Sequence, residues 1–530
     1  MSATHDLVII GAGHNGLVAA TCLAKHGLRP LVLERADRVG GAARTSELAP
    51  GFRCPQLAHR AALDPEIVSA LELERHGLQI IRPAARTWAP AADGRGLTIW
   101  SDARRTAHEL VAFSKSDAGR YPAFLASMAA IGRVLRRVLA TTPPAIDKPG
   151  AADLLEMLRT ARQFRALGKR DAYRLLRWLP MPVADFAREW FESEPLRALV
   201  AADGLLGSHL GPRSAGSAAI LLLLSAGEGQ PIAPGWAARG GTGAVAQSLA
   251  AAARAAGVEI RTGADVREIV VSGRAASGVV LASGETLQAR LVVSNADPRR
   301  TLLGLIDAIH LSPEVRQRVG HIRMRGALAK VNYAVSSLPS FSAFRNSPLA
   351  DQRAALSGCV RLGASLDAIE RAFDAAKYGR YSDSPWIELA IPSIGDPDLA
   401  PAGSHVISAY VQFTPYELRE STWDAERDRL GDIVTRTIAH HAPGFEQSIV
   451  AREVITPLDL ERTYGLTGGH IFHGELALDQ LIVARPLLGW APYRTPIDNL
   501  YLCGSGTHPG TGLDGRSGWL AAQAILGHAR

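Results

Sequence analysis

The chain has 530 residues, of which 47% are hydrophobic and 21% charged, and its formal net charge is +7. These values are typical of a globular protein of about two to four domains with a large core. No stretch approaches the roughly 18 continuous apolar residues that cross a bilayer, and no motif or aromatic platform indicates nucleic-acid binding.

The first fifty residues contain a strand, a glycine-rich turn, a helix and a second strand. The apolar run 7–10 enters Gly11-x-Gly13-x-x-Gly16, and the second apolar run ends at Glu34. Gly11 permits a tight turn, Gly13 lets the backbone approach a pyrophosphate, and Gly16 allows close helix packing. Glu34 is placed to accept hydrogen bonds from ribose hydroxyls. Because these parts occur in register, the sequence predicts a dinucleotide site.

A second glycine motif follows directly. The segment that begins at Arg35 contains Arg38, the pair Gly40-Gly41 and Arg44. The glycines can bring backbone N–H groups to a diphosphate, and Arg38 or Arg44 adds charge-assisted hydrogen bonds. The alternative is a glycine-rich loop with solvated arginines.

The next segment, 85–234, is expected to be rich in helices. The stretches 131–139 and 162–181 look like helices with one apolar and one basic face. Such helices can rest on anionic lipid, although a solvated face is the commoner outcome. The apolar run 218–226 predicts buried core or the wall of an apolar cavity.

Glycine-rich turns return after residue 235. An alanine-rich helix is expected from residue 244, and strands at 258–262 and 266–271. The run 276–294 alternates in period two around a Ser-Gly pair, which predicts a hairpin that returns to a buried strand.

From about residue 300 to 455 the chain changes in character. It contains a strand at 405–412 and amphipathic helices around 425–441. This is where a substrate domain is expected.

The C-terminal segment is an apolar strand, 499–503, that enters a glycine-dense turn and then a helix of small residues. The turn includes Gly504, Gly512 and Leu513. This arrangement brings backbone amides and a helix dipole against a cofactor.

The four cysteines are Cys22, Cys54, Cys359 and Cys503, and they form no C-x-x-C pair. A flavin disulfide reductase needs two nearby thiols, so that mechanism is disfavoured, as is a zinc site. His470-x-x-His473 with Glu475 lacks a third ligand at convincing spacing, and no metal is expected.

The three glycine motifs, with the turn 295–298 and the stretch 468–475, resemble the phytoene desaturase and amine oxidase superfamily of flavoproteins. The resemblance covers nearly the whole chain and is strongest to a group named pyridine nucleotide-disulfide oxidoreductase domain-containing protein 2. It implies FAD as the cofactor. It also implies that the backbone near Val266 holds the adenine, and that Gly504, Gly512 and Leu513 face the flavin.

The resemblance further implies the fold. We expect an α/β protein with a Rossmann-type FAD-binding domain and an inserted α+β substrate or cap domain. The FAD-binding domain would be discontinuous, with residues 1–84, 235–300 and 456–530, and the substrate domain would comprise residues 85–234 and 301–455.

The implied reaction is hydride removal by the flavin from a mainly apolar small molecule, with dehydrogenation of a C–C bond. Oxygen, a quinone or another electron acceptor would reoxidise the flavin. The catalytic candidates are His508 and His473, for which a structural hydrogen-bonding role is equally consistent. Isomerisation or saturation of a polyene is an alternative, and so is amine oxidation, since Trp490 and Tyr493 are similar to aromatic residues that flank amines.

A non-catalytic binding module, like the Rab GDP dissociation inhibitors, is the alternative from another class. The first strand begins about six residues from the start, which leaves no room for a signal peptide, so a cytoplasmic location is expected. Peripheral membrane contact stays open, as do the oligomeric state and the substrate.

Overall fold

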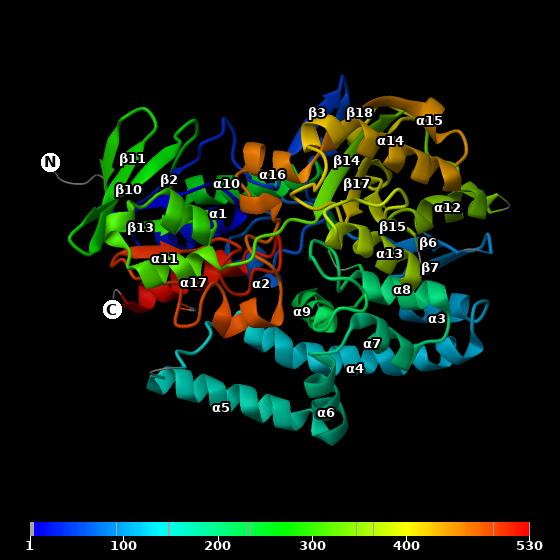
Figure 1. Ribbon diagram of the computed structural model, residues 1–530, viewed down its shortest axis with the longest axis horizontal. Coiled ribbons are helices and arrows are strands. Elements are labelled where there is room, and N and C mark those ends of the chain that lie inside the picture. The colour runs from blue at the N-terminus through cyan, green and yellow to red at the C-terminus, as the bar shows by residue number, and fades with distance from the viewer. Residues whose placement is uncertain are drawn as a thin grey trace.

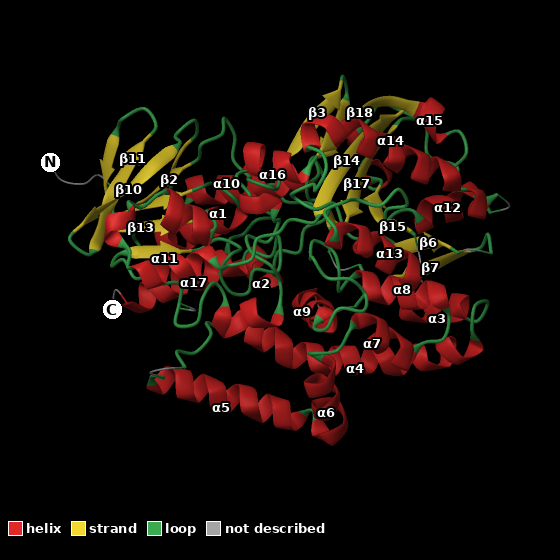
Figure 2. Ribbon diagram, viewed as in Figure 1, coloured by secondary structure: helices red, strands yellow, loops and turns green. Residues whose placement is uncertain are grey.

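A computed structural model describes residues 5–91, 93–146, 149–228, 231–233, 235–345, 347–363, 365–490 and 492–528. Two β-sheets lie toward opposite ends of the molecule, and helices cover both of them (Figure 1). A layer of helices runs along one edge of the molecule (Figure 2). The segments that line the site lie between the two sheets.

The first sheet is parallel and carries the glycine motifs. Its order is β19 (Leu500–Leu502), β13 (Leu291–Ser294), β1 (Leu7–Ile10), β2 (Pro30–Leu33) and β9 (Glu259–Arg261). The helices α1 (His14–Lys25), α10 (Thr242–Ala255) and α17 (Arg516–His528) pack together on it. The chain leaves β1 toward β2 on one side, while β13 pairs on the other side. Ligands of doubly wound sheets bind at such a reversal of strand order.

Smaller sheets flank this unit. The antiparallel set β10 (Val266–Ser272), β11 (Ala275–Leu281) and β12 (Thr286–Gln288) precedes β13, as the alternating pattern predicted. The hairpin of β3 (Thr45–Ala49) and β4 (Phe52–Pro55) follows the second glycine motif, and β5 (Ile80–Ile81) pairs with β8 (Ala237–Ala238).

The second large sheet has seven strands. Its order is β18 (Ile449–Ile455), β14 (Leu328–Val335), β17 (His405–Gln412), β16 (Ile387–Ala390), β15 (Cys359–Leu362), β6 (Ala85–Pro90) and β7 (Gly96–Trp100). The segment 85–234 is rich in helices, as predicted, but it begins with β6 and β7, whose nearly continuous buried side chains complete this sheet. The domain boundaries near residues 84, 235, 300 and 456 stay a prediction.

A helical layer packs beside β6 and β7 around an apolar core. It comprises α3 (Ala103–Leu110), α4 (Lys115–Ala140), α5 (Ala151–Ala166), α6 (Gly168–Trp178), α7 (Val183–Trp190), α8 (Glu194–Ala202) and α9 (Ser217–Glu228). The apolar run 218–226 lies in α9 and is largely buried, as predicted. Within the described residues, no helix is both long enough and apolar enough to span a membrane.

The remaining helices pack around the two sheets, and the last of them also lines the site between the sheets. They are α2 (Pro65–Ala70), α11 (Pro313–Gly320), α12 (Leu349–Ala355), α13 (Leu366–Lys377), α14 (Trp423–His441), α15 (Phe445–Ser448) and α16 (Pro457–Tyr464). The helix α14 matches the amphipathic pattern expected near residues 425–441.

Candidate functional site

A single large cavity runs from the glycine turns to the seven-stranded sheet. Its empty volume is about 1870 Å³, part of it open to solvent. Nine of the twelve residues predicted to bind the cofactor line it: Gly11, Gly13, Glu34, Arg35, Gly41, Arg44, Val266, Gly512 and Leu513. Segments from both ends of the chain therefore meet at one cavity.

The first turn is held by close backbone packing. A Cβ atom on Gly16 would lie 2.2 Å from the carbonyl oxygen of Gly11. A Cβ on Gly13 would lie 2.7 Å from Nδ2 of Asn295, which follows β13. Gly11 itself has a φ of +96°, a conformation that favours glycine. Gly16 does not line the cavity, and its role is to let α1 pack against the turn.

Glu34 lies at the end of β2 and is buried. Its two carboxylate oxygens accept hydrogen bonds from the backbone N–H of Ala12 (2.9 Å) and of Ala36 (3.0 Å). Each oxygen retains lone pairs, so the carboxylate can still accept from ribose hydroxyls at the cavity.

Three arginines give the cofactor end of the cavity its positive charge. They are Arg35, Arg44 and Arg300, and the sequence reasoning did not identify the last. Burial, reinforced by the charge of Arg300, lowers the pKa of Arg35. The Nε of Arg44 is buried and has no hydrogen-bond partner among the described residues. An orphaned guanidinium donor at this position fits a diphosphate.

The C-terminal loop closes the cofactor end. The side chain of Asn15 in α1 donates to Oγ of Ser505 (3.1 Å), and Nε2 of His14 lies 3.0 Å from the carbonyl oxygen of Gly512. Burial lowers the pKa of His14 to about 4, so this ring is neutral at pH 7. Gly504 and Gly40 do not line the cavity, and a Cβ on either would lie within 2.6 Å of a backbone carbonyl oxygen, that of Asn295 or of Ala43.

These features fit FAD. Glycine turns that a Cβ would fill, an acid at the ribose position and an unpaired arginine donor all face one cavity. The role of each individual residue toward the cofactor stays a prediction.

The two candidate histidines lie in different surroundings. His473 lines the cavity, its Nδ1 has no partner among the described residues, and burial lowers its pKa. His508 does not line the cavity. Its Nε2 lies 3.0 Å from the carbonyl oxygen of Val138 in α4, and burial lowers its pKa to about 4. The structure therefore places only His473 within reach of a ligand in the cavity.

The aromatic pair considered for amine oxidation is also away from the cavity. Tyr493 is fully buried, and its hydroxyl donates to the carbonyl oxygen of His508 (2.9 Å). Trp490 packs in the core behind the parallel sheet. Neither residue lines the cavity.

Beyond His473 the cavity becomes an apolar chamber. Its apolar lining includes Leu57, Ala58, Ala61, Leu206, Leu224, Leu328, Leu460, Leu466, Ile471 and Phe472. Leu224 comes from α9, so the apolar run 218–226 does form part of a cavity wall, as predicted.

Lys330, from the middle of β14, is the main polar group of this chamber. Its Nζ lies 2.9 Å from Nδ1 of His59 and 3.8 Å from the ring centroid of Tyr410. The lysine side chain is buried, and burial lowers its pKa to about 7. Burial and the charge of Lys330 lower the pKa of His59 to about 3, so its imidazole is neutral. Near pH 7 the chamber thus holds an amine that exchanges its proton readily.

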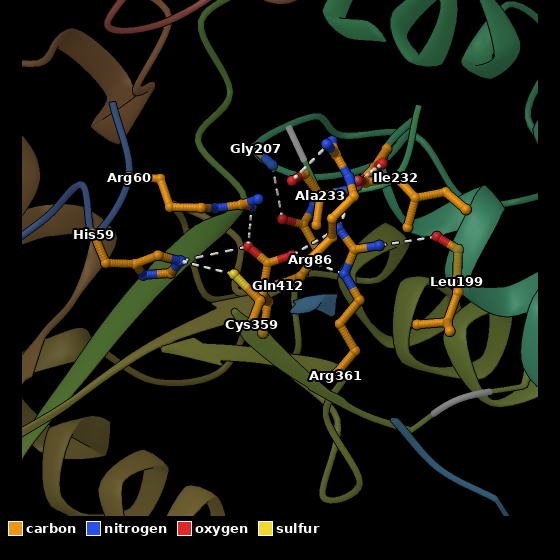
Figure 3. A network of polar contacts seen from close by, with 12 residues as sticks. His59, Arg60, Arg86, Leu199, Gly207, Ile232, Ala233, Cys359, Arg361 and Gln412 are labelled. Carbon is orange, nitrogen blue, oxygen red and sulfur yellow. Dashed lines mark hydrogen bonds and ion pairs between the residues drawn. The ribbon is translucent and has the colours of Figure 1, made fainter. Parts of the chain in front are cut away.

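A buried ion network lies behind His59. Although burial alone would raise it, the pKa of Glu388 is held well below its usual range by Arg60 and Arg361. Arg60 donates to the Glu388 carboxylate at 2.6 Å and Arg361 at 2.8 Å, and Arg361 also pairs with Asp203. Figure 3 shows Arg60 and Arg361 approaching this network from opposite sides, near His59.

Burial is what favours a neutral Lys330, because the charges of the network act on its pKa in opposite directions: Glu388 raises it and Arg60 lowers it. The two arginines balance Glu388 and Asp203, so a proton on Lys330 would add an uncompensated buried charge. Glu388 can only accept hydrogen bonds, and its Oε1 lies 3.5 Å from Nε2 of His59. We therefore assign the imidazole proton to Nε2, which leaves Nδ1 to accept from Lys330.

His59, Cys359 and Glu388 also place three ligand-type atoms within 4.8 Å of one another. Figure 3 shows the Cys359 sulfur beside the His59 ring. The carboxylate is already shared by two arginines, and burial raises the pKa of Cys359 to about 12. This group is better described as part of the ion network than as a metal centre.

Sequence reasoning missed the chamber residues His59, Arg60, Lys330 and Tyr410. No glycine motif or spacing marks them, because they come from separate segments. One signal was available: Lys330 is the single charged residue in the apolar run 327–331. A lysine is rarely buried unless it has a partner, so this position could have been identified.

Comparison with known proteins extends these observations. A model of the NAD(P)-binding Rossmann-like domain matches residues 9–69, and a model of flavin containing amine oxidoreductases matches residues 180–526. A Rattus norvegicus protein named pyridine nucleotide-disulfide oxidoreductase domain-containing protein 2 is 36% identical, over 98% of this chain and 93% of that protein.

Two further proteins are more distant. The lycopene-forming phytoene desaturase of Pantoea ananas is 25% identical over 98% of each chain. The solved structure of a putrescine oxidase bound to putrescine matches with a TM-score of 0.60 over 99% of both chains, at 17% identity. The last comparison shows a shared fold.

Proposed function

The chain belongs to the flavin containing amine oxidoreductase family and is an FAD-dependent oxidoreductase. From this premise we propose that it dehydrogenates a C–C bond of a mainly apolar substrate. The observation that carries the proposal is the apolar chamber, which is continuous with the cofactor end of the cavity. When bound, FAD supplies a two-electron oxidation by accepting a hydride.

The charges that line the cavity separate this reaction from amine oxidation. The described lining contains two acids, Glu34 and Asp265, and both lie at the cofactor end. The chamber instead contains Arg60 and Lys330. A protonated amine would find the Arg60 guanidinium and no carboxylate partner in this lining, whereas an alkyl or polyene chain needs none.

Lys330 is suited to the second half of a dehydrogenation. When a hydride leaves one carbon of a C–C bond, the neighbouring carbon must lose a proton to form the double bond. The neutral Nζ of Lys330 faces the chamber and can accept that proton. His59 holds the amine in place through Nδ1, and the ion network behind it excludes water from this position.

The phytoene desaturase relative supports this proposal, since its name states a desaturation. The flavin would be reoxidised by oxygen, a quinone or another carrier. A polyene isomerase or saturase would use the same chamber, and the test below separates it from a dehydrogenase by its product.

The test is anaerobic incubation of the FAD-loaded protein with apolar alkenes and polyenes in one series and with primary amines in another. We expect the flavin absorption band to bleach with members of the first series, and mass spectrometry to find a product two hydrogen atoms lighter. Lys330→Met should lower the bleaching rate by about 10²–10⁴-fold at unchanged flavin content. The control Lys115→Met, at an exposed position, should have no effect.

Bleaching with amines alone, with a carbonyl product, would replace the proposal by amine oxidation. A product of unchanged mass from a polyene would replace it by isomerisation. Readmission of oxygen then tells an oxidase, which recovers its flavin band quickly, from a dehydrogenase that uses another acceptor.

A further inference from the structure

The helices α5 and α6 carry a concentration of exposed apolar side chains. In the described part of the chain, fifteen large apolar side chains are exposed, and six of them lie on these two helices. Their exposed fractions range from 48% to 66%. The six are Leu154, Leu155, Met157, Leu158, Tyr173 and Leu176. A concentration of exposed apolar side chains of this kind is typical of an interaction site.

The helix α5 packs Phe164 against the apolar core of the helical layer, yet most of its large apolar side chains lie on the exposed side. Its Glu156 points inward and forms an ion pair with Arg137 of α4 (2.6 Å between Oε1 and Nη2). Leu154 and Leu158 lie one helical turn apart and face outward. Figure 1 shows α5 on the outer side of α4, at the edge of the molecule. When the outer face of a surface helix contacts only water, its leucines are usually found on the inner face, toward the core.

The same surface is strongly basic. Residues 151–178 contain seven arginine or lysine residues and three acidic residues, so the net charge of this short segment is +4. The net charge of the whole chain is +7. Arg162 and Arg165 are exposed and follow Leu158 on the same face of α5. Among the described residues, neither forms an ion pair. Leucines flanked by unpaired arginines are the pattern of a helix that lies in a lipid interface.

A second, smaller cavity lies at the end of α4, the helix against which α5 packs. Arg136, Leu139 and Ala140, at the end of α4, line it, and α5 begins eleven residues after Ala140. This cavity shares Ala62, Leu224 and Thr511 with the lining of the large cavity.

We propose that the outer face of α5 and α6 docks this protein on an anionic phospholipid surface. The leucines enter the acyl boundary, and Arg162 and Arg165 lie at the level of the phosphates. Two copies of the chain paired through this face would bring two basic surfaces together, whereas anionic lipid neutralises them. The inference concerns binding and does not depend on the proposed reaction.

The test is flotation of the FAD-loaded full chain with vesicles of phosphatidylcholine alone and with added phosphatidylglycerol. We expect binding to the anionic vesicles only, weakened by salt. The pair Leu154→Gln and Leu158→Gln should reduce the bound fraction about tenfold or more, as should the pair Arg162→Glu and Arg165→Glu.

The matched control is the pair Ile309→Gln and Leu349→Gln, which changes side chains that are 82% and 62% exposed elsewhere and should leave binding unchanged. Equal binding to neutral vesicles, absence of binding, or retention of binding in the leucine variant would each overturn the proposal. If the chain instead forms a dimer in solution that the leucine variant abolishes, the face belongs to a second copy.

Discussion

Nζ of Lys330 and Nδ1 of His59 lie 2.9 Å apart in the apolar chamber, although the two residues are 271 positions apart in the chain. Neither group carries a stable charge there near pH 7, because burial lowers the pKa of the lysine to about 7 and that of the histidine to about 3. The nearby arginines and carboxylates balance one another. The fold thus places a nearly neutral hydrogen-bonded pair beside a fully ionised network.

The titration of Lys330 can be observed without a substrate. The chain contains six lysines, so NMR of protein labelled with ¹³C at lysine Cε should resolve them. We expect one signal to titrate near pH 7 and the others near their ordinary pKa of about 10.4. The low-pH signal should be missing in Lys330→Met. If every lysine signal titrates above about pH 9, the neutral amine in the chamber is refuted.

Glu34 should contribute to cofactor affinity through its charge. Glu34→Gln keeps the size of the side chain, but it loses charge-assisted hydrogen bonds from the ribose hydroxyls and from the backbone N–H groups of Ala12 and Ala36. We expect FAD to bind about 10- to 100-fold more weakly, which corresponds to about 1.5–3 kcal/mol. Fluorescence titration of the apoprotein with FAD measures this. The exposed Glu74→Gln is the control and should match the unmodified protein.

Gly16 should tolerate no side chain. A Cβ at this position would lie 2.2 Å from the Gly11 carbonyl oxygen, so α1 must move away from the glycine turn. Gly16→Ala should lower the melting temperature and abolish FAD retention on purification. In contrast, Gly119→Ala, in α4 with no heavy atom within 4 Å of its Cβ, should stabilise the protein by about 0.5–1 kcal/mol. Normal FAD content in Gly16→Ala would contradict the packing role assigned here.

His473 and His508 should behave differently when replaced. His473 has a φ of +56° and lines the cavity, so His473→Asn, which tolerates this backbone, should change the flavin absorption spectrum with little effect on stability. His508→Asn removes a buried hydrogen bond to Val138 and should lower the unfolding free energy by about 1–3 kcal/mol at an unchanged spectrum. Absorption spectra and thermal unfolding of both variants measure this. The reverse pattern would make His508 the residue near the cofactor.

The sequence by itself determined the cofactor half of the site. Gly11, Gly13, Glu34 and Gly512 were predicted from local strand, turn and helix patterns, and all four line the cavity. The hairpin before β13 and the buried helix α9 followed from periodicity. Residues that are close in the sequence determine short-range geometry, so it can be predicted from the sequence.

Only the tertiary structure decided the substrate half. His59, Lys330 and Glu388 come from three separate segments, and their proton states depend on burial and on the charges that the fold brings around them. It also could not be predicted from the sequence that His508 lies outside the cavity, or that the leucines of α5 face outward. Desolvation and charge pairing are properties of packed surroundings, so they exist only once distant segments have met.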